Sequence, residues 1–144
     1  MDIPIRRLDP AAVLPAQQHE HDAGHDLCAI EPATVRAGGG RALVRTGLAL
    51  AIPPGYAGLV LPRSGLALEH GVTLLNTPGL IDAQYRGELK VLLLNTDPER
   101  DYAIEPGDRI AQLVIQAVAD VVWREVDELD ATTRDTFGFG STGR

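Results

Sequence analysis

The 144-residue sequence contains a single cysteine, Cys28, so an internal disulfide is excluded. Its first residues, Met1–Arg7, lack the apolar core of a signal peptide, and we expect a protein of the reducing cytoplasm. No apolar run approaches the roughly 20 residues that a membrane span requires. Basic residues are outnumbered by acidic ones, 13 to 20, and the formal net charge of -7 argues against a nucleic-acid polymer as partner.

Proline and glycine, in contrast, are plentiful, with 10 and 15 residues that interrupt short apolar stretches at close intervals. This pattern is typical of an all-β sandwich or barrel. A chain of this length is expected to form one domain that buries its core without disulfides or a structural metal.

Four apolar segments are expected to be strands that form two hairpins. Leu48–Ile52 and Tyr56–Leu61, separated by a Pro-Pro-Gly break, predict the first hairpin. Val72–Leu75 and Leu89–Leu94 predict the second, with Asp82 at its tip. Loop tips on rigid strands often carry binding or catalytic groups, although an aspartate is also an ordinary turn former there.

One short helix is expected from about Gly65 to His70, with Ser64 capping its start and Gly71 ending it. A helix start presents unpaired N–H groups and a partial positive charge, and Arg63 adds donors that suit a phosphate. A capped helix beside a surface arginine is the alternative interpretation of the same residues.

A polar side chain interrupts the last apolar strand. In Ile110–Ile115 the two-residue period places Gln112 on an apolar face. Its amide therefore needs a hydrogen-bond partner to offset desolvation, in a structural or a functional role.

The C-terminal residues 134–144 combine glycines with two phenylalanines and two arginines. Glycine N–H groups can wrap phosphates, arginines supply charge, and an aromatic ring can close over a flat base. This composition predicts a flexible flap, with terminal disorder as the alternative. It is not a Walker loop, because no Gly-Lys-Ser/Thr follows a strand.

The segment His19–Asp26 holds three histidines and raises the alternative of a transition-metal site, because imidazoles two residues apart can converge on one ion. With Gly47, Pro53 and Gly55 it partly resembles the cupins, which are also β-barrels. Gly58, however, stands where a third ligand histidine is expected, and clustered polar residues in a loop need no ion.

Five motifs follow one another over nearly the whole chain: Ala23–Leu27, Pro62–Ala67, Gly79–Glu88, Pro106–Leu113, and Arg134 followed by Gly138–Gly143. In order and spacing they resemble the motifs of the trimeric deoxyuridine triphosphatases. The resemblance implies a jelly-roll-like distorted β-barrel with one short helix over residues 1–133. It also implies a flexible glycine-rich C-terminal arm, residues 134–144, that closes over the active site.

The same resemblance implies a homotrimer with exchanged C-terminal arms, in which three subunits share each site. One subunit would give the third-motif hairpin, a second the phosphate motifs, and a third the arm. A monomer is then expected to be inactive.

The resemblance implies that dUTP is the substrate and that its uracil and deoxyribose lie in the third-motif hairpin. Asn76 and backbone groups of Leu80, Ile81 and Lys90 would bond the base edges. Tyr85 would press against C2′ and leave no space for a ribose hydroxyl. The closed hairpin would exclude the 5-methyl of thymine, while cytosine reverses the donor and acceptor pattern.

By the same analogy, Asp82 contacts the 3′-hydroxyl and orients or deprotonates a water that attacks the α-phosphorus in line, releasing dUMP and pyrophosphate. Mg²⁺ is the implied cofactor, held mainly by phosphates and waters, with Asp26 acting through water. Such an activity keeps uracil out of DNA and supplies dUMP for thymidylate synthesis. The remaining implied substrate ligands are Arg63, Ser64, Gly65 and Gln112 on the phosphates, and Arg134, Phe139, Gly140, Ser141 and Thr142 in the closing arm.

The chain departs from the family pattern in the arm, where Asp135 and Phe137 replace the usual glycines. A stiffer arm leaves open a nucleotide sensor or interaction protein that binds dUTP with little turnover. A dCTP deaminase of the same fold is a further alternative, against which the complete third motif with Tyr85 argues.

Overall fold

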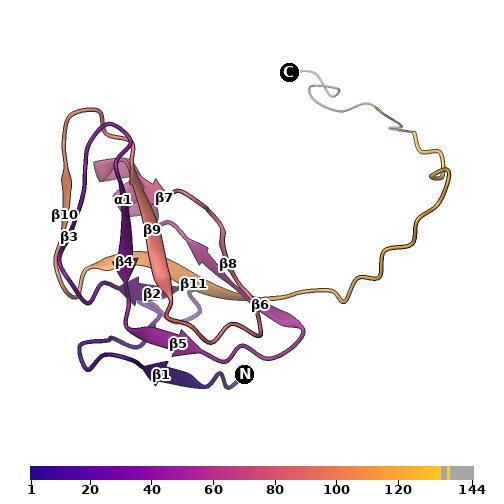
Figure 1. The fold of residues 1–144 in the computed structure, drawn as a ribbon, viewed down its shortest axis with the longest axis horizontal. Helices are drawn as coiled ribbons and strands as arrows, with labels where there is room; N and C mark the ends of the chain where they lie inside the picture. The colour runs from indigo at the N-terminus through magenta and orange to yellow at the C-terminus, as the bar shows by residue number, and fades with distance from the viewer. Residues whose placement is uncertain (134–135, 137–144) are drawn as a thin grey trace.

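The computed structural model describes residues 1–133 and Thr136. Over these residues it is built almost entirely of strands, with one short helix (Figure 1). The all-β prediction is confirmed. The elements are β1 (Ile5–Arg7), β2 (His25–Cys28), β3 (Ala33–Val35), β4 (Arg41–Arg45), β5 (Leu48–Leu50), β6 (Tyr56–Leu61), α1 (Ser64–His70), β7 (Val72–Leu74), β8 (Gly79–Ile81), β9 (Lys90–Asn95), β10 (Tyr102–Ile104) and β11 (Arg109–Ala117).

The strands pair antiparallel in four small sheets, of order β2-β11-β6-β8, β4-β9-β7, β1-β5 and β10-β3. Their apolar faces enclose one core, because each sheet must bury its hydrophobic side against another. The largest side chains of this core that lie almost wholly out of solvent are Leu27, Leu48, Ile52, Leu89, Leu93, Ile104 and Ile110.

The predicted first hairpin was wrong. β5 pairs with β1, whereas β6 pairs with β11 and β8. All three residues of β5 are buried, so this strand needs cover on both faces. The Pro-Pro-Gly break, with Gly55 at a φ of 83°, carries the chain to another sheet instead of folding it back on itself.

The predicted pairing of the second hairpin was right, but the predicted connection between its two strands was too simple. β7 and β9 pair antiparallel, with Leu74 opposite Leu93. The segment between them does not form a simple tip, because it contains β8, which joins β6 in the other sheet with Gly79 opposite Val60. Asp82 therefore directly follows a strand that is anchored in a second sheet.

The helix matches the prediction except at its start. Ser64 is the first helical residue and not the cap. Arg63 occupies the cap position with an extended backbone and makes no side-chain capping bond, so its guanidinium is available for other partners. The predicted end at Gly71 is confirmed, because this residue has a φ of 65° and donates its N–H to the Ala67 carbonyl at 3.2 Å.

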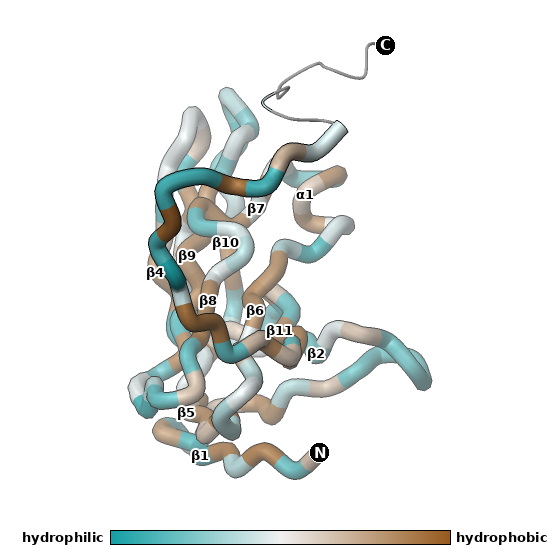
Figure 2. Tube along the Cα trace, turned by 90° about the vertical axis from the view of Figure 1, so that its right-hand side faces the viewer, coloured by the Kyte–Doolittle hydropathy of each residue, from teal (hydrophilic) through white to brown (hydrophobic). Residues whose placement is uncertain are grey.

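After β11 the chain runs away from the strands (Figure 1). Apolar and hydrophilic residues alternate along this segment (Figure 2), and Val122, Trp123 and Leu129 are 89%, 91% and 86% exposed. Among the described residues, no helix is both long and apolar enough to cross a bilayer.

Candidate active site

A cavity of about 260 Å³ lies where β8 ends and β9 begins. A smaller one of about 50 Å³ adjoins it, shares Leu80, Ile81 and Lys90 with it, and adds Asn76. The structure thus brings together all six residues that were predicted to surround the base and sugar. They are Asn76, Leu80, Ile81, Asp82, Tyr85 and Lys90, joined by one further lining residue, Glu88.

The strand pairing places Asp82 at the mouth of this cavity. Gly58 of β6 lies opposite Ile81, and a side chain at position 58 would come within 3.2 Å of the Ile81 Cβ. This close approach lets β8 pack tightly on β6 before the chain turns. The turn then closes through the Tyr85 N–H, which donates to the Asp82 carbonyl at 3.1 Å.

The ring of Tyr85 is half exposed and is held by its hydroxyl, which donates to the backbone carbonyl of Glu88 at 2.9 Å. Gly87 permits this arrangement, because a Cβ at position 87 would lie 2.6 Å from Cζ of the ring. The position of the Tyr85 ring therefore requires glycine at position 87.

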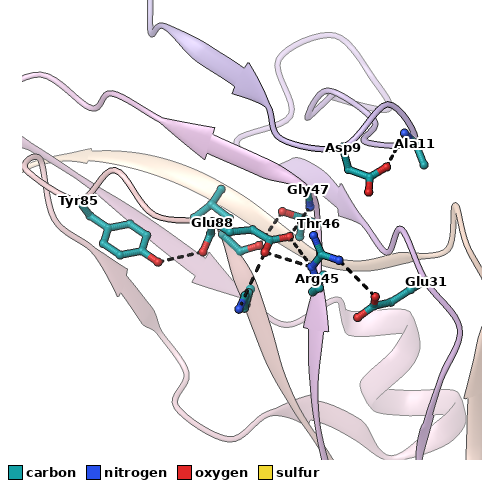
Figure 3. A network of polar contacts seen from close by, with 10 residues as sticks. Asp9, Ala11, Glu31, Arg45, Thr46, Gly47, Tyr85 and Glu88 are labelled. Atoms are coloured by element: carbon teal, nitrogen blue, oxygen red, sulfur yellow. Dashed lines mark hydrogen bonds and ion pairs between the residues drawn. The ribbon is translucent and has the colours of Figure 1, made fainter.

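The Glu88 carboxylate is anchored to a different part of the chain (Figure 3). Nε of Arg45 lies 3.1 Å from each carboxylate oxygen, and the Gly47 N–H donates to Oε1 at 3.0 Å. The Arg45 guanidinium also faces Glu31 at 3.6 Å. The hydrogen bond to Glu88 raises the pKa of Arg45. Sequence reasoning missed this network, because Arg45 and Glu88 are 43 positions apart and no local pattern connects them.

A second cluster gathers the predicted phosphate ligands beside the start of α1. Nη1 of Arg63 donates to the Arg109 carbonyl at 2.6 Å, and its Nε lies 3.5 Å from Oδ1 of Asp26. Gln112 donates to the Pro62 carbonyl at 3.0 Å, which confirms that its amide finds a partner. Arg109 belongs to the fourth motif, but sequence reasoning assigned it no role.

A glycine of the first motif makes room for Gln112. A Cβ at Gly24 would lie 3.0 Å from Cδ of Gln112. Asp26, two residues later, is opposite Gln112 in the β2–β11 pair. The first and fourth motifs are thus joined by direct packing.

Asp26 is the carboxylate that was expected near Mg²⁺, and its oxygens face Arg63 and Arg109. Over residues 1–133 and Thr136, His, Cys, Asp and Glu side chains nowhere gather in threes that could hold an ion. One carboxylate fits an ion that takes most of its ligands from phosphates and water, as Mg²⁺ does. The histidine segment His19–Asp26 does not form a transition-metal site in this part of the chain.

The cavity and the phosphate cluster lie apart within this chain. Gly58 of β6 faces Ile81, and Leu61 of the same strand faces Gln112. A strand rises about 3.3 Å per residue, so roughly 10 Å of β6 separates the two positions. Asp82 and Arg63 lie beyond them at opposite ends.

Over residues 11–143 the sequence matches the family described as dUTPase. The chain belongs to the dUTPase family. The predicted family and enzyme class are thereby confirmed.

Other dUTPases resemble the chain over nearly its full length. It is 56% identical over 141 residues, 98% of this chain and 78% of the relative, to a deoxyuridine 5'-triphosphate nucleotidohydrolase of Thermobifida fusca. It is 54% identical to the protein of that name from Corynebacterium glutamicum, with 99% and 95% of the two chains covered.

Solved dUTPase structures share the fold. Staphylococcus bacteriophage 80alpha dUTPase with dUPNHPP superimposes with a TM-score of 0.91 and 29% identity, over 99% of each chain. A variant of the phage phi11 dUTPase of S. aureus, described with a structural Mg(II) ion, has a TM-score of 0.83 and 27% identity over 91% of this chain and 100% of that one. The jelly-roll-like barrel that the motifs predicted is confirmed.

The remaining predicted residues of this dUTPase, Arg134, Phe139, Gly140, Ser141 and Thr142, lie outside the described residues. For the predicted residues that form the two clusters, the roles assigned to them stay predictions. A larger cavity of about 410 Å³ between β1 and β11 is lined mainly by apolar residues and by none of the residues of the two clusters.

Proposed function

We propose that this chain is a cytoplasmic homotrimeric enzyme that hydrolyses dUTP to dUMP and pyrophosphate by attack of water on the α-phosphorus. The convergence of Asp82, Tyr85, Asn76 and the β8 backbone on two adjoining cavities carries the proposal. The names of its relatives support the same reaction.

The cavity accounts for substrate choice by shape and by hydrogen bonding. Asn76 and the backbone of Leu80, Ile81 and Lys90 bond the uracil edges, so that cytosine, which reverses donors and acceptors, leaves buried groups unpaired. The ring of Tyr85 lies against C2′ of the sugar. A ribose hydroxyl at that carbon collides with it.

Asp82 contacts the 3′-hydroxyl and orients or deprotonates the attacking water. The phosphates are held by Arg63, by Gln112 and by the start of α1 at Ser64 and Gly65, where backbone N–H groups are unpaired. Asp26 would hold Mg²⁺ through water beside the phosphates, and the ion would supply charge neutralisation for the triphosphate. The chain's own part is to align the water with the leaving pyrophosphate.

Two features support a site shared between subunits. The cavity and the phosphate cluster lie apart on β6, which fits a substrate that takes its phosphate ligands from another subunit. The segment after β11 also exposes Val122, Trp123 and Leu129, which a neighbouring subunit can cover. Its continuation, residues 134–144, then closes over an active site that other subunits form.

The test is to mix the purified chain with Mg²⁺ and dUTP, dCTP, dTTP or UTP separately and to measure pyrophosphate and monophosphate release. We expect release from dUTP alone. Tight binding of dUTP without release would replace the enzyme by the nucleotide sensor and point to Asp135 and Phe137 in the arm. Ammonia release from dCTP would identify the deaminase.

A further inference from the structure

The Glu88 carboxylate ties the loop between β8 and β9 to another part of the barrel. The Glu88 side chain is 13% exposed, and both of its oxygens accept from Nε of Arg45. Gly47, in the turn after β4, donates its N–H to the same group at 3.0 Å. Charge-assisted hydrogen bonds of this kind are stronger than neutral ones and fix a side chain in one geometry.

The same residue also holds the tyrosine. Its backbone carbonyl accepts the Tyr85 hydroxyl at 2.9 Å, and Gly87 lets the ring pass close to the backbone between them. A continuous set of contacts therefore runs from β4 through Glu88 to the ring that lines the cavity (Figure 3). Figure 3 shows Arg45 and Tyr85 approaching Glu88 from opposite sides.

The strand that follows the loop has contacts of its own besides the Arg45–Glu88 pair. Leu89 is bound to the same turn by its backbone, because its N–H donates to the Leu48 carbonyl at 2.7 Å and its carbonyl accepts from the Thr46 hydroxyl at 2.7 Å. Loss of the Arg45–Glu88 pair is thus expected to loosen residues 82–88 while the strands on each side stay in place.

We propose that Arg45 and Glu88 are positioning residues that fix the ring of Tyr85 and thereby set the discrimination between deoxyribose and ribose nucleotides. The inference rests on the proposed function. A ring excludes a 2′-hydroxyl only while it cannot move, because a shift on the order of 1 Å is enough to spoil alignment in an active site. Neither Arg45 nor Glu88 needs to contact the nucleotide for this purpose.

Three variants each weaken a different part of this set of contacts. Arg45→Gln removes the guanidinium, Glu88→Gln removes the charge of the carboxylate, and Tyr85→Phe removes the hydroxyl that binds the Glu88 carbonyl. The readout is the ratio of kcat/KM for dUTP to that for UTP. We expect each variant to lower this ratio about tenfold, which corresponds to the loss of one hydrogen bond. The Arg45→Gln/Tyr85→Phe double variant should lose little more than either single variant, because both act through one ring.

Arg36→Gln is the matched control. Arg36 forms a comparable ion pair, 2.6 Å from Asp101, but Asp101 does not line the cavity. This variant should leave the dUTP to UTP ratio unchanged, even if it lowers stability in urea.

The outcomes separate the two proposals. One outcome would overturn the positioning role and leave the proposed function intact. In it, the native protein cleaves dUTP selectively, and the Arg45→Gln and Glu88→Gln proteins keep its ratio of kcat/KM for dUTP to that for UTP. A folded native protein that releases no pyrophosphate from dUTP would overturn both. A lowered ratio in Glu88→Gln and Tyr85→Phe supports the positioning role even if Arg45→Gln does not fold.

Discussion

The side chains of Arg109 and Asp26 meet diagonally across the β2–β11 pair, with Nη1 of the arginine 3.1 Å from Oδ2 of the aspartate. The ladder is irregular at this point, since the register shifts between Arg109 and Ala111. The Arg109 guanidinium lies at this irregularity and points toward a carboxylate that also faces Arg63. Two positive groups around one negative group leave an excess of positive charge, which suits a triphosphate.

Replacing Asp82 separates binding from chemistry. In Asp82→Asn the side chain keeps its size and loses its basicity, so we expect dUTP to bind while kcat falls by at least about 100-fold, the usual contribution of a general base. Binding is measured by calorimetry with a non-hydrolysable analogue, and turnover by pyrophosphate release. The control is Asp101→Asn, because the Asp101 carboxylate binds Arg36 and the Ala37 N–H and not the cavity. Retained turnover in Asp82→Asn would refute the assigned role.

Replacing Arg63 should weaken recognition of phosphates and not of the nucleoside. A charge-assisted hydrogen bond contributes about 1.5–3 kcal/mol, so Arg63→Gln is expected to weaken dUTP binding about tenfold or more. Binding of deoxyuridine, which has no phosphates, should be unchanged. Equal weakening for both ligands would mean that the substitution disturbs the fold around Arg109 rather than a phosphate site.

Trp123 is the only tryptophan in the sequence and is 91% exposed in the single chain. If a neighbouring subunit covers the segment after β11, the fluorescence emission of Trp123 should be blue-shifted at high protein concentration. On dilution, as the subunits separate, the emission should move to the red. Trp123→Ser should then weaken the assembly in sedimentation experiments. Leu68→Ser, at a residue of α1 that is 87% exposed, provides the comparison. A red emission at every concentration would contradict coverage of Trp123.

Asp97 predicts a dependence of stability on pH. It accepts backbone N–H bonds from Glu99 and Arg100 and the side chain of Arg100, which lower its pKa to about 2. A carboxylate with a lowered pKa stabilises the fold above its unfolded value of about 3.9, and the contribution is lost as the pH falls to about 2. Asp97→Asn should therefore be less stable than the native protein in urea at pH 7, and the difference should shrink below pH 4. If the stability difference between Asp97→Asn and the native protein does not change with pH, it arises from packing and not from the charge of Asp97.

The third motif was predictable as a site because its residues are consecutive. Asp82 and Tyr85 lie within one short loop, so any fold that keeps the loop together keeps them near each other. Pairing of the first hairpin was not predictable, since periodicity identifies a strand without selecting its neighbour. The cap at Arg63 was missed because Ser64 has the stronger intrinsic preference, which the extended backbone of Arg63 overrides.

Short-range patterns in the sequence are enough to establish the strand-rich class, the helix end at Gly71 and the motifs that place the chain among the dUTPases. Which side chains meet across the barrel depends on how the strands are arranged in three dimensions. Arg45 reaches Glu88 over 43 positions, and Arg109 reaches Asp26 over 83. Such contacts depend on the register and path of strands that burial of a common core brings together, and no local stretch of sequence contains that information.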